Sequence, residues 1–289
     1  MKYMVIKFKN EIFFKYIKDS NLYEIYRDRN KIDILLRKII SRLNNNLLNQ
    51  FFGKWKKNLK NTDVVIFTDN PYRSQMAKYV KKKSNCKVIL YYWNVINENN
   101  KKILKDKNID EIWTFDENDS KKYNIKFFPQ FYYNCIEKSK LSGNTPNYDC
   151  IFLGAVKDRK NEILDVKKIL DEENIKTYFK IVYNKNDFIE YSEYLDLITK
   201  TRAIIDIVGE SQSGLTLRVL EALYYSKKLI TNNKNIKKYD FYNKNNIFII
   251  GEDDKNNLKN FINAKFDTMG QEKYIKKYSY ENWINTLVK

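Results

Sequence analysis

The stretch "SQSGLTLRVLEALYYSKKLITNN" (residues 211–233) joins a polar loop to an apolar helix and then to a short apolar strand. It follows the apolar run "RAIIDIV" (202–208), so the pattern predicts a strand, a loop, a helix and a second strand. The chain has only seven glycines, and two of them, Gly209 and Gly214, fall in or beside this loop. Because glycine lets the backbone approach a ligand closely, the loop is predicted to contact one.

The predicted helix begins near Leu215 or Thr216, where its free N–H groups and its dipole favour an anion. Arg218 and Glu221 are three residues apart, so they share one face in the first turns of this helix. Arginine can bind a diphosphate through two parallel hydrogen bonds, and glutamate can accept from both hydroxyls of a ribose. Together they suit a nucleotide diphosphate. The alternative is an ordinary ion pair between the two side chains on a solvated helix face.

Apolar runs alternate with segments of helical pattern along most of the chain, which predicts parallel sheets covered by helices. A linker is expected at 136–147, which holds a glycine and one of the three prolines. We therefore predict an α/β fold of two doubly wound, Rossmann-like domains facing each other across a cleft that binds the ligands. Strands are expected at 3–8, 63–68, 87–93, 111–116 and 125–131, and after the linker at 148–154, 176–182, 202–208, 227–231 and 246–250.

Residues 31–52 are predicted to form one long amphipathic helix, because apolar residues recur at three- and four-residue spacing from Ile32 to Leu48. The wider segment 31–57 is also rich in Lys and Arg. One interpretation is a helix that lies on an anionic membrane surface. The other is a domain helix whose apolar face packs on the sheet.

The chain carries 54 Lys and Arg against 36 Asp and Glu, a formal net charge of +18 over 289 residues. Such an excess suggests an anionic partner: a nucleic acid, an acidic membrane or a phosphorylated substrate. The bias of an AT-rich genome toward Lys, Asn, Ile and Tyr is an alternative that needs no partner. The charge is spread along the sequence without a nucleic-acid-binding motif, so we expect no nucleic acid and keep nucleic-acid binding as a rival hypothesis.

The sequence contains no histidine, which excludes Ser-His-Asp triads and histidine zinc sites. The three cysteines lack the spacing of a disulfide framework or a metal knuckle and are expected to be reduced thiols. No signal peptide and no membrane span is expected. These features predict a cytoplasmic protein, peripheral at the inner membrane face if segment 31–57 touches the bilayer.

Further candidate residues follow other predicted strands. In "GAVKDRKNEIL" (154–164), Gly154 ends a strand, and Lys157 and Arg159 follow at the entry to a helix. A basic loop at this place can clamp phosphates. The alternative is a solvated basic loop in a lysine-rich protein.

In the first half, "IFTDNPYRSQ" (66–75) places Asp69 at a strand end, and Asp69 is the candidate catalytic base. Asn70, Asn94 and Asp116 are candidates for contacts with the acceptor. Asn70 and Asp116 are alternatively ordinary helix N-caps.

The chain resembles the GT-B-type bacterial glycosyltransferases of capsule and lipopolysaccharide biosynthesis. The stretch "QSGLTLRVLEALYYSKKLITNNKNIKKYDFYNKNNIFII" (212–250) carries most of the resemblance. "VILYYWNVI" (88–96), "EIWTFDENDSKKYNIKFFPQFY" (111–132) and "YDCIFLGAVKDRKNEIL" (148–164) carry it more loosely.

The resemblance implies an acceptor-side domain at 1–140, a nucleotide-sugar donor domain at 147–268, and a C-terminal helix at 269–289 that packs back on the first domain. It also implies a glycan or lipid-linked glycan as acceptor, no cofactor and no metal. Glu221 would hold the ribose and residues 213–218 the diphosphate. The expected donor-binding residues are Gly154, Lys157, Arg159, Ser213, Gly214, Leu215, Thr216, Arg218 and Glu221.

One position departs from the family pattern. Many retaining members carry a second glutamate eight positions before the first, where this chain has Ser213. Retention and inversion therefore both stay open. Another nucleotide-sugar enzyme on the same architecture is an alternative, although the lack of a GxGxxG motif after the first strand argues against an NAD-dependent one.

Overall fold

The computed structural model describes residues 1–7, 13–27, 30–43, 45–69, 72, 74–136, 138–141, 145–156, 159–209 and 214–289. The chain forms two compact units, Met1–Pro129 with Ile284–Lys289, and Gln130–Trp283. The expected linker lay later, at 136–147. The chain enters the second unit earlier because Phe131 packs on Trp283 and Tyr132 packs on Tyr224, with ring centroids 4.5 and 5.0 Å apart.

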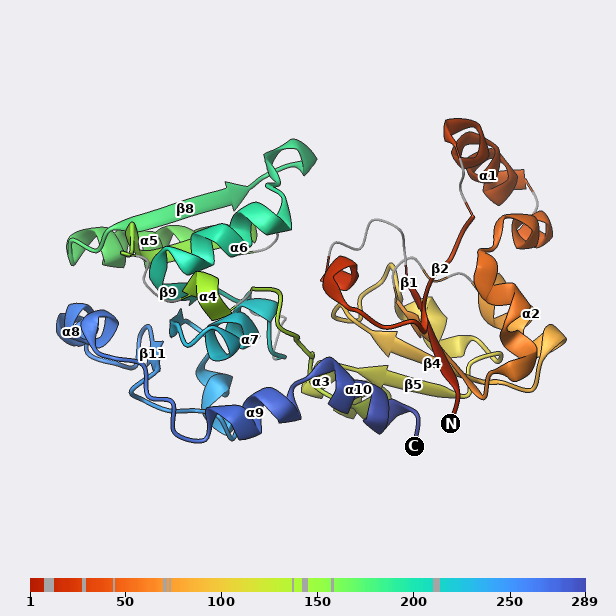
Figure 1. Cartoon of the computed structure of the whole chain (residues 1–289). Helices are drawn as coiled ribbons and strands as arrows, with labels where there is room; N and C mark the ends of the chain where they lie inside the picture. The colour runs from red at the N-terminus through yellow and green to blue at the C-terminus, as the bar shows by residue number, and fades with distance from the viewer. Residues whose placement is uncertain are drawn as a thin grey trace. The chain divides into compact units, whose positions relative to one another are not determined.

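The first unit is built on one parallel sheet with the strand order β2-β1-β3-β4-β5-β6 (Figure 1). Five of its strands match predicted ones, whereas the three-residue β2 is too short to show a pattern in the sequence. The strands are β1 (Tyr3–Lys7), β2 (Leu22–Glu24), β3 (Val64–Thr68), β4 (Lys87–Tyr92), β5 (Glu111–Thr114) and β6 (Lys126–Phe127).

Helix α2 (Ser74–Lys83) covers one face of this sheet. Its Met76, Ala77 and Val80 are buried in one apolar cluster with side chains of β1, β3 and β4. A short helix, α3 (Glu117–Tyr123), follows β5. The segment 97–107, which has a helical pattern, forms only a 3₁₀ turn, Lys101–Lys105.

The long helix expected at 31–52 ends early. Helix α1 spans Lys31–Leu43, and the chain then continues in 3₁₀ turns at Asn45–Phe51, Lys54–Lys57 and Leu59–Asn61. The apolar face of α1 does not pack on the sheet, since Ile32 is 65% and Leu35 is 58% exposed. The domain helix with a buried apolar face is therefore wrong for Lys31–Leu43, whereas Leu48, Phe52 and Trp55 of the same segment, 31–57, are buried in the core.

The second unit has a parallel sheet with the strand order β11-β10-β9-β7-β8. All five of its strands match predicted ones. They are β7 (Tyr148–Ala155), β8 (Thr177–Val182), β9 (Thr201–Asp206), β10 (Lys228–Thr231) and β11 (Ile247–Ile249). The helices are α4 (Lys138–Leu141), α5 (Lys160–Glu172), α6 (Tyr191–Thr199), α7 (Leu217–Tyr224), α8 (Leu258–Asn263), α9 (Gln271–Lys277) and α10 (Tyr280–Leu287).

Helices α5 and α8 bury their apolar stripes in one cluster with side chains of β7, β9 and β10. The chain runs from β7 to β8 at one side of the sheet and then returns to place β9 on the other side of β7. The strand order therefore reverses between β7 and β9. In open α/β sheets, ligands bind outside the carboxyl ends of the strands at such a reversal.

The single C-terminal helix predicted from the sequence is broken between α9 and α10. At the break, Tyr132 N–H donates to the carbonyl of Tyr278 at 2.8 Å, and Tyr280 N–H donates to the carbonyl of Tyr132 at 3.1 Å. The end of α10, from Ile284, belongs to the first unit. None of the described helices combines the length and the apolar character needed to cross a membrane.

Candidate functional site

Arg218 lies in the first turn of α7, at the carboxyl edge of the second unit's sheet. Its Nε and Nη2 are both 3.0 Å from Oδ1 of Asp206, and its Nη1 donates to the carbonyl of Leu153 at 3.3 Å. Its side chain remains 15% exposed. Arg218 is therefore held by the ends of β7 and β9, and its ion-pair partner is Asp206.

Asp206 is the last residue of β9 and is fully buried. Besides Arg218, it accepts a hydrogen bond from the Thr216 hydroxyl at 2.7 Å and one from the Thr231 hydroxyl at 3.4 Å. These partners come from the start of α7 and from β10, and the buried carboxylate fixes the direction of the Arg218 guanidinium. Asp206 is not among the residues predicted from the sequence, although a single acid inside the apolar run 202–208 is a visible signal.

Arg159 immediately precedes α5 and is almost completely buried. Its Nε and Nη2 donate to the carbonyl of Ala155 at 3.2 and 3.0 Å, and its Nη1 donates to the carbonyl of Ile207. The solvated basic loop is thus the wrong interpretation for this residue. The guanidinium instead bridges the carboxyl ends of β7 and β9, at the reversal of strand order.

Gly154 lies between the two guanidinium groups. A Cβ atom at this position would lie 3.0 Å from Nη2 of Arg159, 3.5 Å from Nη1 of Arg218 and 2.9 Å from Cζ of Phe152. A side chain would therefore displace one of these groups. The glycine allows two cations to converge on one strand end.

The N-cap residue of α7, Thr216, makes no side-chain hydrogen bond to the first N–H groups of the helix. The Thr216 hydroxyl donates to Asp206 instead of serving the helix N–H groups. Gly214 and Leu215, which precede it, are buried. Lys157 and Ser213, two of the expected donor ligands, lie outside the described residues.

Glu221 is 1% exposed, so a solvated surface ion pair with Arg218 is the wrong interpretation of this residue. Its Oε1 accepts from the Tyr191 hydroxyl at 2.7 Å, and its Oε2 accepts from the Tyr194 hydroxyl at 2.8 Å. Burial raises the pKa of Glu221, while the two tyrosine hydroxyls and the nearby charge of Arg218 act in the opposite direction.

The hydroxyl network continues beyond Glu221. The Tyr191 and Tyr132 hydroxyl oxygens are 2.8 Å apart, and those of Tyr132 and Tyr225 are 3.0 Å apart. Of the two donors to Glu221, Tyr194 is buried and Tyr191 is partly exposed. The sequence gives no signal for this arrangement, because Tyr191 and Tyr194 lie on helix α6, 30 and 27 residues before Glu221.

Asp69 follows β3 in the first unit, where the strand order also reverses, between β1 and β3. Its Oδ1 accepts from the Trp93 backbone N–H at 2.8 Å, and its Oδ2 accepts from the side-chain amides of Asn94 at 3.1 Å and Asn100 at 3.5 Å. Burial raises the pKa of Asp69, and these hydrogen bonds oppose the rise. The structure therefore brings together two predicted residues, Asp69 and Asn94.

Asp116 serves as the N-cap of α3, as one interpretation of the sequence predicted. Its Oδ1 accepts from the Asp119 backbone N–H at 3.0 Å, and the side chain is buried. Asn70 lies outside the described residues. In the part of the chain that the structure describes, no group of three or more acidic or cysteine side chains is placed to hold a metal ion.

No protein-family model matches the chain, and no curated protein matches it in sequence. Two of the solved structures similar to the chain have a TM-score above 0.5 and match most of its length. One is an alpha-glucosyltransferase in complex with UDP and a 13-mer DNA containing a HMU base, with a TM-score of 0.51 and 11% identity, covering 82% of this chain and 83% of that one. The other is a UDP-forming alpha,alpha-trehalose-phosphate synthase from Burkholderia xenovorans, with a TM-score of 0.52 and 9% identity, covering 90% and 78%. This likeness confirms the predicted fold, two Rossmann-like domains of the GT-B type.

Proposed function

We propose that this protein is a glycosyltransferase that takes a sugar from a nucleotide-sugar donor bound at the carboxyl edge of β7 and β9. The observation that carries the proposal is the convergence of Arg159 and Arg218 on Gly154, at the reversal of strand order. The names of the two structures with the same fold support it, since one binds UDP and the other forms UDP.

The site has the chemistry that departure of a nucleoside diphosphate requires. Negative charge builds on the diphosphate as the sugar leaves, and fixed guanidinium groups and helix N–H groups stabilise that charge without reorganising. Asp206 orients Arg218 but neutralises part of its charge. Arg159 and the N-terminus of α7 therefore contribute the remaining stabilisation of the negative charge on the diphosphate. The donor nucleotide that we favour is UDP.

We propose that Glu221 binds the ribose of the nucleotide-sugar donor. Both of its oxygens already accept hydrogen bonds, so a ribose hydroxyl has to replace one donor. Tyr191 is the donor that can leave, because it is partly exposed, whereas Tyr194 is buried.

For the acceptor, we propose that Asp69 takes the proton from the attacking hydroxyl if the reaction inverts the anomeric centre. A raised pKa makes a carboxylate a stronger base at neutral pH, although the three amide donors hold this one firmly. We further propose that the acceptor is a capsule or lipopolysaccharide glycan, on the resemblance of segment 212–250 to enzymes of that kind.

We also propose that α1 rests on an anionic membrane surface. Its exposed apolar side chains include Ile32, Leu35 and Ile39, and Lys31 and Lys38 accompany them. Sedimentation with vesicles of phosphatidylglycerol should be lost in Leu35→Ser, and equal sedimentation of this variant and the wild type would refute the proposal.

The proposed transfer needs no metal, because the arginines can neutralise the diphosphate. Transfer measured in excess EDTA should match transfer with added Mn²⁺. Activity that EDTA abolishes and Mn²⁺ restores would contradict this part of the proposal.

A screen of nucleotides tests the proposed function. UDP, GDP, CMP and their sugars are each added at increasing concentration, and the melting temperature is followed. A ligand at about 100 times its Kd stabilises the folded state by about 2.7 kcal/mol, so the correct nucleotide should raise the melting temperature clearly. No response to any nucleotide would remove the proposal.

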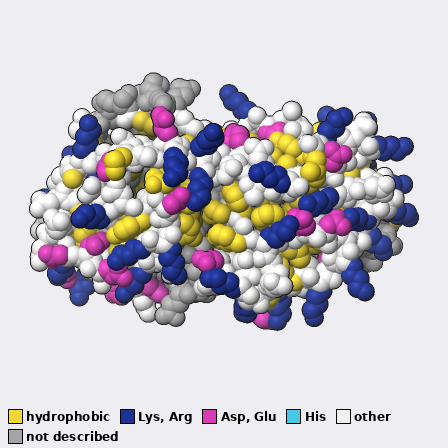
Figure 2. Space-filling view, turned by 90° about the horizontal axis from the view of Figure 1, so that it is seen from below, with side chains coloured by type: hydrophobic (Ala, Val, Ile, Leu, Met, Phe, Trp, Pro, Cys, Tyr) yellow, Lys and Arg dark blue, Asp and Glu magenta, His cyan; other side chains and the backbone are white. Residues whose placement is uncertain are grey.

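Nucleic-acid binding is the rival hypothesis, since one structure of this fold contains DNA. The surface gives it little support. On the face that Figure 2 shows, Lys and Arg side chains are scattered with Asp and Glu among them and form no single basic patch.

A further inference from the structure

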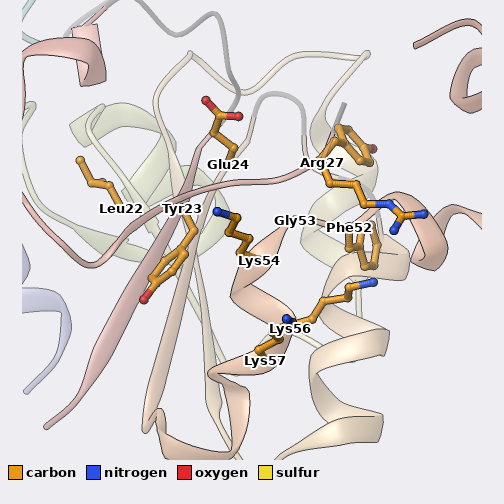
Figure 3. Close-up of a pocket in the computed structure, with 10 residues that line it drawn as sticks. Leu22, Tyr23, Glu24, Arg27, Phe52, Gly53, Lys54, Lys56 and Lys57 are labelled. Atoms are coloured by element: carbon orange, nitrogen blue, oxygen red, sulfur yellow. The ribbon is translucent and has the colours of Figure 1, made fainter. Parts of the chain in front are cut away.

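A pocket of about 670 Å³ lies in the first unit, away from the strand reversal, at the outer edge strand β2. Two segments of the chain form it, the end of β2 with the residues after it and the turn around Lys54–Lys57. The lining residues are Leu22, Tyr23, Glu24, Tyr26, Arg27, Phe52, Gly53, Lys54, Lys56 and Lys57 (Figure 3).

The two segments are joined firmly by the backbone. Gly53 N–H donates to the carbonyl of Ile25 at 2.7 Å, and Arg27 N–H donates to the carbonyl of Phe51 at 2.8 Å. The indole N–H of the buried Trp55 donates to the same Ile25 carbonyl at 3.0 Å. A Cβ at Gly53 would lie only 2.2 Å from the carbonyl oxygen of Glu24, so this close approach requires glycine. The backbone contacts between the two segments therefore fix the walls of the pocket.

Among the described lining residues, the four cations Arg27, Lys54, Lys56 and Lys57 outnumber the one carboxylate, Glu24. None of these cations takes part in an ion pair within the described residues. The Lys56 ammonium donates to the carbonyl of Asn49 at 3.1 Å, and burial together with the charge of Arg27 lowers the pKa of Lys56. Two cations are thus held near each other, which favours an anion between them.

Figure 3 shows the Arg27 guanidinium and the Lys56 ammonium on the Phe52 side of the pocket, with the Glu24 carboxylate on the opposite side. A fifth cation, Arg37, stacks on the Tyr26 ring with its Cζ 4.1 Å from the ring centroid. The volume exceeds what a bare phosphate would need and is in the range of small-molecule sites. The partly exposed rings of Tyr23 and Tyr26 supply apolar surface for the rest of a ligand, and the buried Phe52 ring packs against Tyr26.

We propose that this pocket binds a phosphorylated sugar, with its phosphate or diphosphate on Arg27 and Lys56 and its sugar ring against the aromatic walls. The site is separate from the donor site and does not depend on the proposed function. The sugar phosphate has two sources, a soluble one and the diphosphate head group of a lipid-linked sugar.

Calorimetric titration with glucose 1-phosphate and with inorganic pyrophosphate tests the site directly. Arg27→Gln and Lys56→Met should each weaken binding by about tenfold or more, because each removes a charge-assisted hydrogen bond. Raising the NaCl concentration should weaken binding of the wild type as well. Lys105→Met, which removes an exposed lysine elsewhere in the same unit, should bind like the wild type.

Vesicles identify the source of the phosphate. If a lipid head group is the source, phosphatidic acid vesicles should retain Leu35→Ser, in which α1 no longer binds anionic vesicles, and release the double variant Leu35→Ser/Arg27→Gln, while phosphatidylcholine vesicles retain neither. Arg218→Lys should weaken nucleotide binding and leave glucose 1-phosphate binding unchanged, which separates this site from the donor site. The assignment is overturned if neither probe binds, or if both pocket variants bind the probes as tightly as the wild type does.

Discussion

Arg218 and Asp206 form an ion pair at the carboxyl edge of the second unit's sheet, with two guanidinium nitrogens each 3.0 Å from one carboxylate oxygen. Asp206 is fully buried. The pair therefore has two consequences. It holds the Arg218 guanidinium at the proposed donor site. It also makes the stability of the second unit depend on Arg218, which the site needs.

Asp206→Asn should destabilise the protein. The substitution leaves Arg218 without its charge partner, and breaking a buried pair from one side costs about 3–5 kcal/mol. Since Arg218 is partly exposed, the lower end of this range is expected. Urea unfolding measures the change. Asp149→Asn, which breaks the exposed pair with Arg202, is the matched control and should change stability by less than about 1 kcal/mol. Equal effects would show that the buried pair has no special structural role.

The two tyrosines that donate to Glu221 should differ in their effects. Tyr194→Phe removes a buried donor and should lower the free energy of unfolding by about 1–3 kcal/mol. Tyr191→Phe should also lower the free energy of unfolding, because the Tyr191 hydroxyl bonds both Glu221 and Tyr132, and the difference between the two variants is expected in UDP binding. If a ribose hydroxyl takes the place of Tyr191, this second variant should bind UDP at least as tightly as the wild type. A loss of affinity in Tyr191→Phe as large as that in Glu221→Gln would contradict the proposed exchange.

The raised pKa of Glu221 predicts a pH dependence of stability. The folded state keeps the proton to a higher pH than the unfolded state, whose glutamate titrates near the ordinary value of 4.5. The contribution of Glu221 to the free energy of unfolding is therefore fully present below pH 4.5. It is lost as the pH rises from there through the pKa of Glu221 in the folded state. Relative to Glu221→Gln, the wild type should lose stability over this interval. A constant difference between the two proteins from pH 4 to pH 8 would show that the pKa is not raised.

Asp69→Asn should abolish sugar transfer and leave nucleotide affinity unchanged, because Asp69 belongs to the first unit. An asparagine also turns an NH₂ group toward the amides of Asn94 or Asn100, so some loss of stability is expected. The kcat and the urea midpoint are therefore measured together. Asn100→Ala removes one amide donor but keeps the carboxylate, and it should retain transfer. Normal turnover in Asp69→Asn would exclude Asp69 as the base.

Much of the fold was predictable from the sequence because the buried strands are short apolar runs. All ten predicted strands are present, including "RAIIDIV" (202–208), which forms β9. The strand β2 escaped prediction because its three residues show no alternation. The spacing of apolar residues after Lys31 correctly predicted helix α1. The same spacing does not reveal whether another part of the protein packs on the apolar face of the helix.

The candidate site was predictable only in part. Gly154, Arg159 and Arg218 could be found because Gly154 lies at the end of a predicted strand and the two arginines lie at the start of the helices that come after strands, and the fold brings the ends of parallel strands together. Their partners could not be found. Asp206 of β9 meets Arg218 of α7 across twelve residues, and Tyr194 of α6 meets Glu221 of α7 across twenty-seven, so both contacts depend on how α7 packs in the fold.

The most direct test of the account is calorimetric titration of UDP into the wild type, Arg218→Lys and Arg202→Lys. Lysine at position 218 keeps a charge beside Asp206 but cannot bind a diphosphate through two parallel hydrogen bonds. Arg202 is an exposed arginine of β9 and serves as the matched control. The account predicts that UDP binds the wild type and the Arg202 variant equally, and binds the Arg218 variant about tenfold or more weakly. Equal affinity of all three proteins for UDP, or no binding of UDP to the wild type, would contradict it.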